Sequence, residues 1–224
     1  MEIVELDEKL RSLSDENSRQ SWSLLDTAGH PTYGLNFAKI AQIAREVGKD
    51  SCLADELYAS GNHDLQVLAT YLDDSDSYTR DDLRRRAHQL YLSPFAEKFC
   101  KLVLAKSRHA VEFIDEWMAG DNETLHCYAF YALEALAGRK NNLSVDFYAR
   151  YVAEITLNIQ GKPDAVKEAM HEALVAIGCR DASLQKRATK AIQKMGEITF
   201  NNGNRLDCLE LFEKRLQAKK LVRG

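Results

Sequence analysis

Two clusters of lysine and arginine are the residues of this 224-residue chain whose types and spacing most suggest chemistry. The first cluster consists of Arg84, Arg85, Arg86, Lys98, Lys101, Lys106 and Arg108, and the second of Lys186, Arg187, Lys190 and Lys194. Clustered cations can contact phosphate groups, because lysine and arginine neutralise the charge of a nucleic-acid backbone. They can equally form a solvated helix surface that acidic residues such as Asp81, Asp82 and Glu97 balance. The sequence leaves both interpretations open for each cluster.

No familiar catalytic or metal-binding motif accompanies these clusters in the sequence. His171-Glu172 begins a zinc-protease pattern, but Val175 stands where that pattern requires its second histidine. The six histidines show no other metal-ligand spacing, and the sequence has no glycine-rich phosphate loop or nucleophile elbow. We therefore expect neither a metal nor a cofactor.

The composition is typical of a helical protein without a membrane segment. Three prolines and eleven glycines leave little room for long irregular segments. No run approaches the roughly twenty apolar residues of a membrane helix, and the N-terminal segment is acidic and unlike a signal peptide. Five widely spaced cysteines without a CxxC pattern indicate reduced thiols and a cytoplasmic location. The formal net charge of −4 argues against a general nucleic-acid binder, although local clusters can override it.

Apolar residues recur at three- and four-residue spacing through most of the chain, which predicts an all-α protein. The clearest example is a pair of helices over residues 166–196. Gly178 is expected to end the first helix of this pair, and Asp181 to cap the second. Similar stripes predict about a dozen helices, a capping box that starts at Thr79, and one short β-like segment near the C-terminus.

Paired helical units recur at roughly the 35–47-residue spacing of two-helix solenoid repeats. We therefore predict one right-handed α-solenoid domain of HEAT-like two-helix repeats over residues 1–224. N-terminal helices occupy 1–30, the repeat array 33–196, and a tail with a last helix 197–224. Such arrays present a concave surface, lined by the second helix of each repeat, on which partners usually bind. Since identity between the units is weak, an irregular helical bundle is the alternative.

Two segments carry a more specific pattern. The segment over 35–74 contains Ile40, Ala41, Gly48, Leu57, Ser60-Gly61, His63, Leu68-Ala69 and Asp73-Asp74. The later segment contains Val166, Ala169-Met170, Ala173-Leu174, Ile177-Gly178, Arg180, Ala188, Ala191, Met195-Gly196, Gly203 and Cys208. In this order, over roughly residues 33–210, the chain resembles the DNA alkylation repair family, the AlkD-like HEAT-repeat DNA glycosylases.

The resemblance implies that double-stranded DNA binds on the concave face and that N3- or N7-alkylated purines are removed from it. In such enzymes the alkylated base is a cationic leaving group, and a carboxylate stabilises the positive charge that develops on the sugar. An aromatic ring against the deoxyribose and an arginine near the phosphate complete the site. At the matching positions this chain has Glu97 for the aspartate, Ser93 for the tryptophan and Cys127 for the arginine. Val175 replaces a further groove arginine.

Two functions from different classes fit these observations. In the first, the protein engages DNA on its concave face with altered or lost glycosylase activity, and Glu97 is the catalytic carboxylate. Glu97 also suits an ordinary helix residue paired with Lys101, and Ser93 an ordinary N-cap. In the second, a non-catalytic α-solenoid binds a protein or a structured nucleic acid, which the lost site residues and the acidic net charge favour. The sequence does not indicate an oligomeric state.

Overall fold

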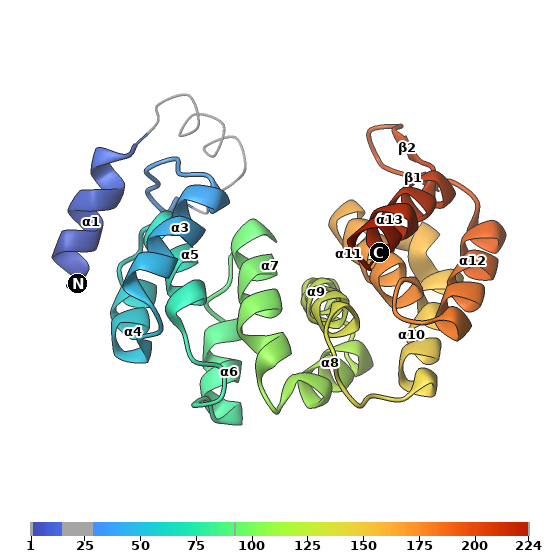
Figure 1. Ribbon diagram of the computed structural model, residues 1–224, viewed down its shortest axis with the longest axis horizontal. Helices are drawn as coiled ribbons and strands as arrows, with labels where there is room; N and C mark the ends of the chain where they lie inside the picture. Colours follow the sequence, from blue (N-terminus) through green and yellow to red (C-terminus); the bar gives the residue numbers. More distant parts are fainter. Residues whose placement is uncertain (1, 15–28, 92, 224) are drawn as a thin grey trace. The chain divides into compact units, whose positions relative to one another are not determined.

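The computed structural model describes residues 2–14, 29–91 and 93–223, apart from the side chains of residue 93 and residues 219–223 (Figure 1). These residues contain twelve α-helices, two short 3-10 helices and one two-stranded sheet, which confirms the all-α prediction. A search of the described helices finds none with the length and apolar character needed to span a membrane. The chain packs into two compact units, Met1–His109 and Ala110–Gly224.

The first unit is built around α5 (His63–Leu72), which is buried along almost its whole length. This helix packs against α3 (Phe37–Val47), α4 (Ser51–Ala59) and α7 (Ser93–Leu102). The other described elements of the unit are α1 (Ile3–Ser12), α6 (Arg80–Ala87) and the 3-10 helix η1 (Leu104–Lys106).

A buried polar network joins α4, α6 and the end of α5. Asp73 accepts hydrogen bonds from the hydroxyl groups of Tyr58 and Tyr78, and burial raises the pKa of its carboxyl group. The guanidinium of Arg86 lies 4.2 Å from the centre of the Tyr58 ring and pairs with Asp55. Only 8% of the Arg86 side chain is exposed, so this residue packs α6 against α4.

In the second unit, successive helices alternate between two layers (Figure 1). One layer consists of α8 (Ala110–Ala119), α10 (Val145–Asn158) and α12 (Ala182–Met195). The other consists of α9 (Glu123–Gly138), α11 (Asp164–Gly178) and α13 (Cys208–Arg223). α11 packs against α9, α10, α12 and α13 and is buried over most of its length. This alternation is what stacked two-helix repeats require, because each helix pair buries its apolar faces against the next pair.

The helix ends predicted from the sequence are confirmed. Gly178 is the last residue of α11, and the carboxylate of Asp181 caps α12 by accepting two backbone N–H bonds from its first turn. Thr79 forms the predicted capping box at the start of α6. The β-like segment is a hairpin of β1 (Ile198–Thr199) and β2 (Arg205–Leu206). The remaining element is the 3-10 helix η2 (Ile159–Gly161), which follows α10.

Gly178 marks a close approach between α11, α12 and α13. A Cβ atom at this position would lie 2.6 Å from the Cβ atom of Ala188 and 2.6 Å from ring atoms of Phe212. Carbon atoms in van der Waals contact lie about 3.5–4.0 Å apart, so any larger residue must displace its neighbours. Because the nearest atoms belong to buried side chains, α12 or α13 would have to shift.

We predict that Gly178→Ala destabilises the protein by about 1–3 kcal/mol, the usual range for overpacking a core. The free energy of unfolding is measured by urea denaturation followed by circular dichroism. Gly138→Ala is the matched control, since Gly138 also ends its helix but has no atom within 4 Å of the added Cβ. An equal loss of stability in both variants would contradict the packing role of Gly178.

Candidate nucleic-acid interface

Glu97 lies on α7 with its carboxylate engaged by a lysine one helical turn later. Its Oε1 atom is 2.7 Å from Nζ of Lys101, and the two side chains are 31% and 22% exposed, respectively. Burial and the nearby charge of Glu97 raise the pKa of Tyr71 on α5, so the phenol lies within electrostatic range of the carboxylate. Ser93 is the first residue of α7, but its side chain is outside the described part of the chain, and its role stays a prediction.

The two positions at which the resemblance places arginines lie on α9 and α11 and are buried. Cys127 is 6% exposed, and its Sγ atom lies 3.5 Å from the carbonyl oxygen of Ala165 on α11. Val175 is 3% exposed. Both side chains contribute to the packing of the second unit, and neither presents a charge to solvent.

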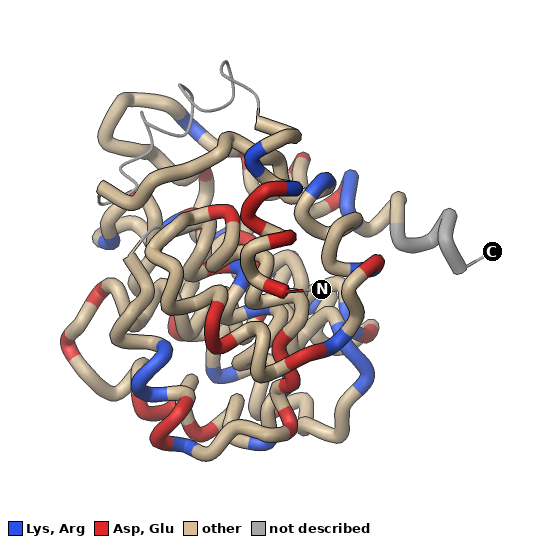
Figure 2. Tube along the Cα trace, turned by 90° about the vertical axis from the view of Figure 1, so that its left-hand side faces the viewer, with Lys and Arg blue, Asp and Glu red and all other residues tan. Residues whose placement is uncertain are grey.

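On α6, the arginines of the first basic cluster are paired with acidic neighbours or buried. Arg84 lies 3.6 Å from Asp81, and Arg85 lies 2.9 Å from Asp82. Lysine and arginine positions are interspersed with acidic ones along the trace (Figure 2). Arg86 is held in the buried network, and its position conflicts with the predicted phosphate contact. We therefore exclude Arg86 from the candidate interface.

The remaining cations of the first cluster lie on α7 and around η1. Nζ of Lys98 is 4.5 Å from the centre of the Phe37 ring, and Lys101 is held by its ion pair. Lys106 and Arg108 are exposed. The first cluster therefore combines partly buried and exposed cations from several elements, and it forms no continuous stripe on one helix.

The second basic cluster, in contrast, forms a continuous stripe along α12, here called the α12 stripe. Its members are Lys186, Arg187, Lys190 and Lys194. All four are exposed, and none forms an ion pair with any acidic residue that the structure describes. With about 100° between successive residues, they fall within one arc of the helix. The opposite face carries the buried residues Leu184, Ala188, Ala191 and Ile192, which pack α12 against its neighbours. The stripe extends along about 12 Å of helix.

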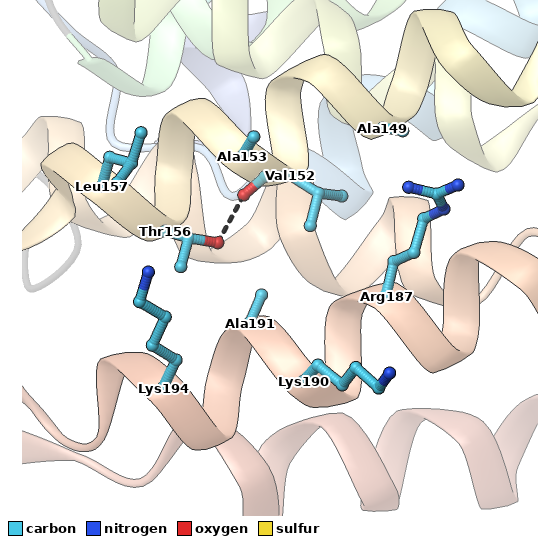
Figure 3. Close-up of a pocket in the computed structure, with 9 residues that line it drawn as sticks. All are labelled: Ala149, Val152, Ala153, Thr156, Leu157, Arg187, Lys190, Ala191 and Lys194. Carbon is cyan, nitrogen blue, oxygen red and sulfur yellow. Dashed lines mark hydrogen bonds between the residues drawn. The ribbon is translucent and has the colours of Figure 1, made fainter.

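Three members of the α12 stripe also line a groove of about 320 Å³ between α10 and α12 (Figure 3). Arg187, Lys190 and Lys194 follow one another along the α12 side. The α10 side and the floor are formed by Ala149, Val152, Ala153, Thr156, Leu157 and Ala191. The groove thus has a cationic wall and a mainly apolar wall.

The α12 stripe and the two buried family positions occupy different layers of the second unit. The stripe lies on α12, in the layer with α8 and α10, whereas Cys127 and Val175 lie on α9 and α11. The α12 stripe therefore does not coincide with the positions at which the resemblance places arginines. Helical spacing in the sequence predicted the α12 stripe. It did not predict the groove, because the second wall belongs to α10 and the sequence does not show that α10 and α12 pack side by side.

Metal-binding geometry does not occur in the described ranges. No group of three or more histidine, cysteine, aspartate or glutamate side chains there could hold a metal ion. His171, from the incomplete zinc-protease pattern, is buried, and its Nδ1 atom lies 3.7 Å from its neighbour Glu172.

Comparison with known proteins identifies the family. The sequence model of the family described as DNA alkylation repair enzyme matches residues 6–206, and the chain therefore belongs to this family. No curated protein matches the chain significantly.

One solved structure has the same fold, with a TM-score of 0.86 and 21% sequence identity, over 98% of this chain and 95% of the other. It represents a new family of proteins related to the HEAT-like repeat DNA glycosylases with affinity for branched DNA structures. At this identity, the match shows the HEAT-like repeat fold.

Proposed function

We propose that the protein binds DNA through the α12 stripe and has weak or no activity as an alkylpurine glycosylase. The observation that carries the proposal is the row of four exposed cations without acidic partners among the described residues. Such a row can neutralise successive phosphates, and the release of condensed counterions then drives association. It does so even though the whole chain is acidic, because the local charge distribution governs the contact.

Family membership and the structural neighbour support DNA as the partner. The neighbouring structure belongs to proteins with affinity for branched DNA, and the two chains share their fold over almost their full lengths. We therefore choose a four-way DNA junction as the first probe, together with a duplex of the same sequence.

Weak or absent excision is proposed from the side chains at the family-site positions. A carboxylate stabilises a developing positive charge best when its own charge is not already compensated. Here Lys101 compensates Glu97, and Cys127 and Val175 provide no cation for a phosphate. An alkylated purine is a good leaving group and needs little general acid. Any residual rate of excision therefore depends on the Glu97 carboxylate.

The proposed interface predicts a specific salt dependence of DNA binding. In fluorescence anisotropy titrations, the slope of log K against log salt changes by about 0.9 per phosphate contact. Lys186→Gln with Lys190→Gln should lower the affinity for junction DNA and make the slope shallower by roughly two units. The matched control is Lys39→Gln with Lys140→Gln, which removes the same charge from exposed positions outside the stripe and should bind like the unmodified protein.

Equal effects of the two double variants would contradict the assignment of the interface. No measurable binding of junction or duplex at about 50 mM salt would overturn the proposed DNA function altogether.

Excision of alkylated bases tests the proposed role of Glu97. The purified protein should release little 3- or 7-methylated purine from alkylated DNA, and Glu97→Gln should abolish what is released, because the variant lacks the carboxylate charge. Released bases are quantified by chromatography and mass spectrometry. Glu8→Gln, a change at an exposed carboxylate on α1, is the control and should have no effect. Release at a rate typical of active family members, unaffected by Glu97→Gln, would disprove both the weak activity and the role of Glu97.

A further inference from the structure

The two walls of the groove between α10 and α12 differ in charge. A contact with DNA phosphates would involve only the cationic wall. Its α12 wall carries Arg187, Lys190 and Lys194, while its α10 wall carries no charged side chain (Figure 3). A phosphate backbone needs only the cations. The neutral wall is therefore available to a partner that combines acidic with apolar groups.

That neutral wall is apolar and partly open to solvent. Leu157 is 71% exposed, more than any other large hydrophobic side chain in the described part of the chain. Beside it, Ala153 is exposed and Val152 is buried. The small side chains of Ala153 and Ala191 leave space between the two helices, into which a bulky apolar side chain of a partner can fit. Burying such surface contributes about 25 cal/mol per Å² to binding.

The scarcity of polar groups on the α10 wall favours a peptide segment over a small molecule as the partner. Small-molecule sites usually combine an apolar pocket with several polar groups that fix the orientation of the ligand. In this groove the hydroxyl of Thr156 already donates to the carbonyl oxygen of Val152, at 2.5 Å. The α10 wall thus offers apolar contact without directional hydrogen bonds from its side chains.

We propose that this groove binds an amphipathic helix of a protein partner, with acidic side chains towards α12 and leucine-like side chains against α10. Charge complementarity on the α12 wall and apolar complementarity on the α10 wall favour this partner. Arg187, Lys190 and Lys194 follow the i, i+3, i+7 spacing of one helical face, so a row of glutamates with the same spacing can face them. Helix-in-groove recognition uses this kind of periodic anchoring.

The inference goes beyond the proposed DNA function and does not depend on it. Arg187, Lys190 and Lys194 belong both to the groove wall and to the α12 stripe. An acidic helix seated in the groove would therefore compete with DNA for these cations.

The test uses a fluorescein-labelled synthetic peptide with glutamates on one helical face and leucines on the other, and a scrambled peptide of the same composition. Fluorescence anisotropy with the full chain should show that the amphipathic peptide binds at least about tenfold more tightly than the scrambled one. Equal binding of the two peptides would mean a purely electrostatic attraction and would overturn the proposal.

A pair of neutral substitutions separates the groove from the α12 stripe. Ala153→Gln with Leu157→Ser narrows the groove and removes its exposed leucine without changing any charge. The affinity for the peptide should fall at least about tenfold, and the affinity for junction DNA should not change. Val145→Ser, at another exposed apolar residue of α10, is the matched control. Unaltered thermal denaturation by circular dichroism shows that the variants fold.

Two outcomes distinguish this inference from the proposed function. If the protein binds junction DNA but not the peptide, or if Ala153→Gln with Leu157→Ser leaves peptide binding unchanged, the helix-binding groove is wrong and the DNA function stands. If the peptide binds with the expected dependence on the groove but DNA does not bind, the groove stands and the DNA function is wrong.

Discussion

One arginine, between α11 and α12, links three helices of the second unit through its hydrogen bonds and its ring contact. Arg180 donates hydrogen bonds to the backbone carbonyl oxygens of Ala137 and Arg139, at 3.0 and 2.7 Å, and to the side chain of Asn141 at 2.7 Å. Its guanidinium also lies 4.7 Å from the centre of the buried Tyr148 ring. The last carbonyl groups of a helix lack intrahelical partners, and a cation there complements the helix dipole. Arg180 thus ties the end of α9 and the start of α10 to the turn that begins α12.

The packing of α12 against its neighbours determines which of its faces reaches solvent. With α12 fixed against α10 and α11, its apolar stripe is buried, and the opposite face must carry the four cations. In the other layer, the tight packing of α9 with α11 leaves Cys127 and Val175 as buried residues. The second unit therefore has a cationic surface on α12. At Cys127 and Val175, where the resemblance places arginines, it has buried side chains that serve in packing.

Local features of this protein could be predicted from its sequence, whereas features that depend on distant segments could not. The cap at Asp181, the end of α11 at Gly178 and the ion pair of Glu97 with Lys101 involve residues within one or two turns of each other. The spacing of residues along a single helix was also sufficient to predict the α12 stripe. The burial of Arg86 depends on residues of α4 about thirty positions earlier, and the groove depends on an α10 wall contributed by a different helix. Periodicity cannot show either arrangement, because it does not specify which helices become neighbours.

Lysine footprinting can locate the DNA on the protein directly. The protein is acetylated under limiting conditions with and without a saturating four-way junction, and the modification of each lysine is measured by mass spectrometry. We predict that Lys186, Lys190 and Lys194 are protected by the junction, while the exposed Lys39 and Lys140 remain as reactive as in the free protein. Unchanged reactivity along α12, with protection confined to other lysines, would show that DNA does not bind through the α12 stripe.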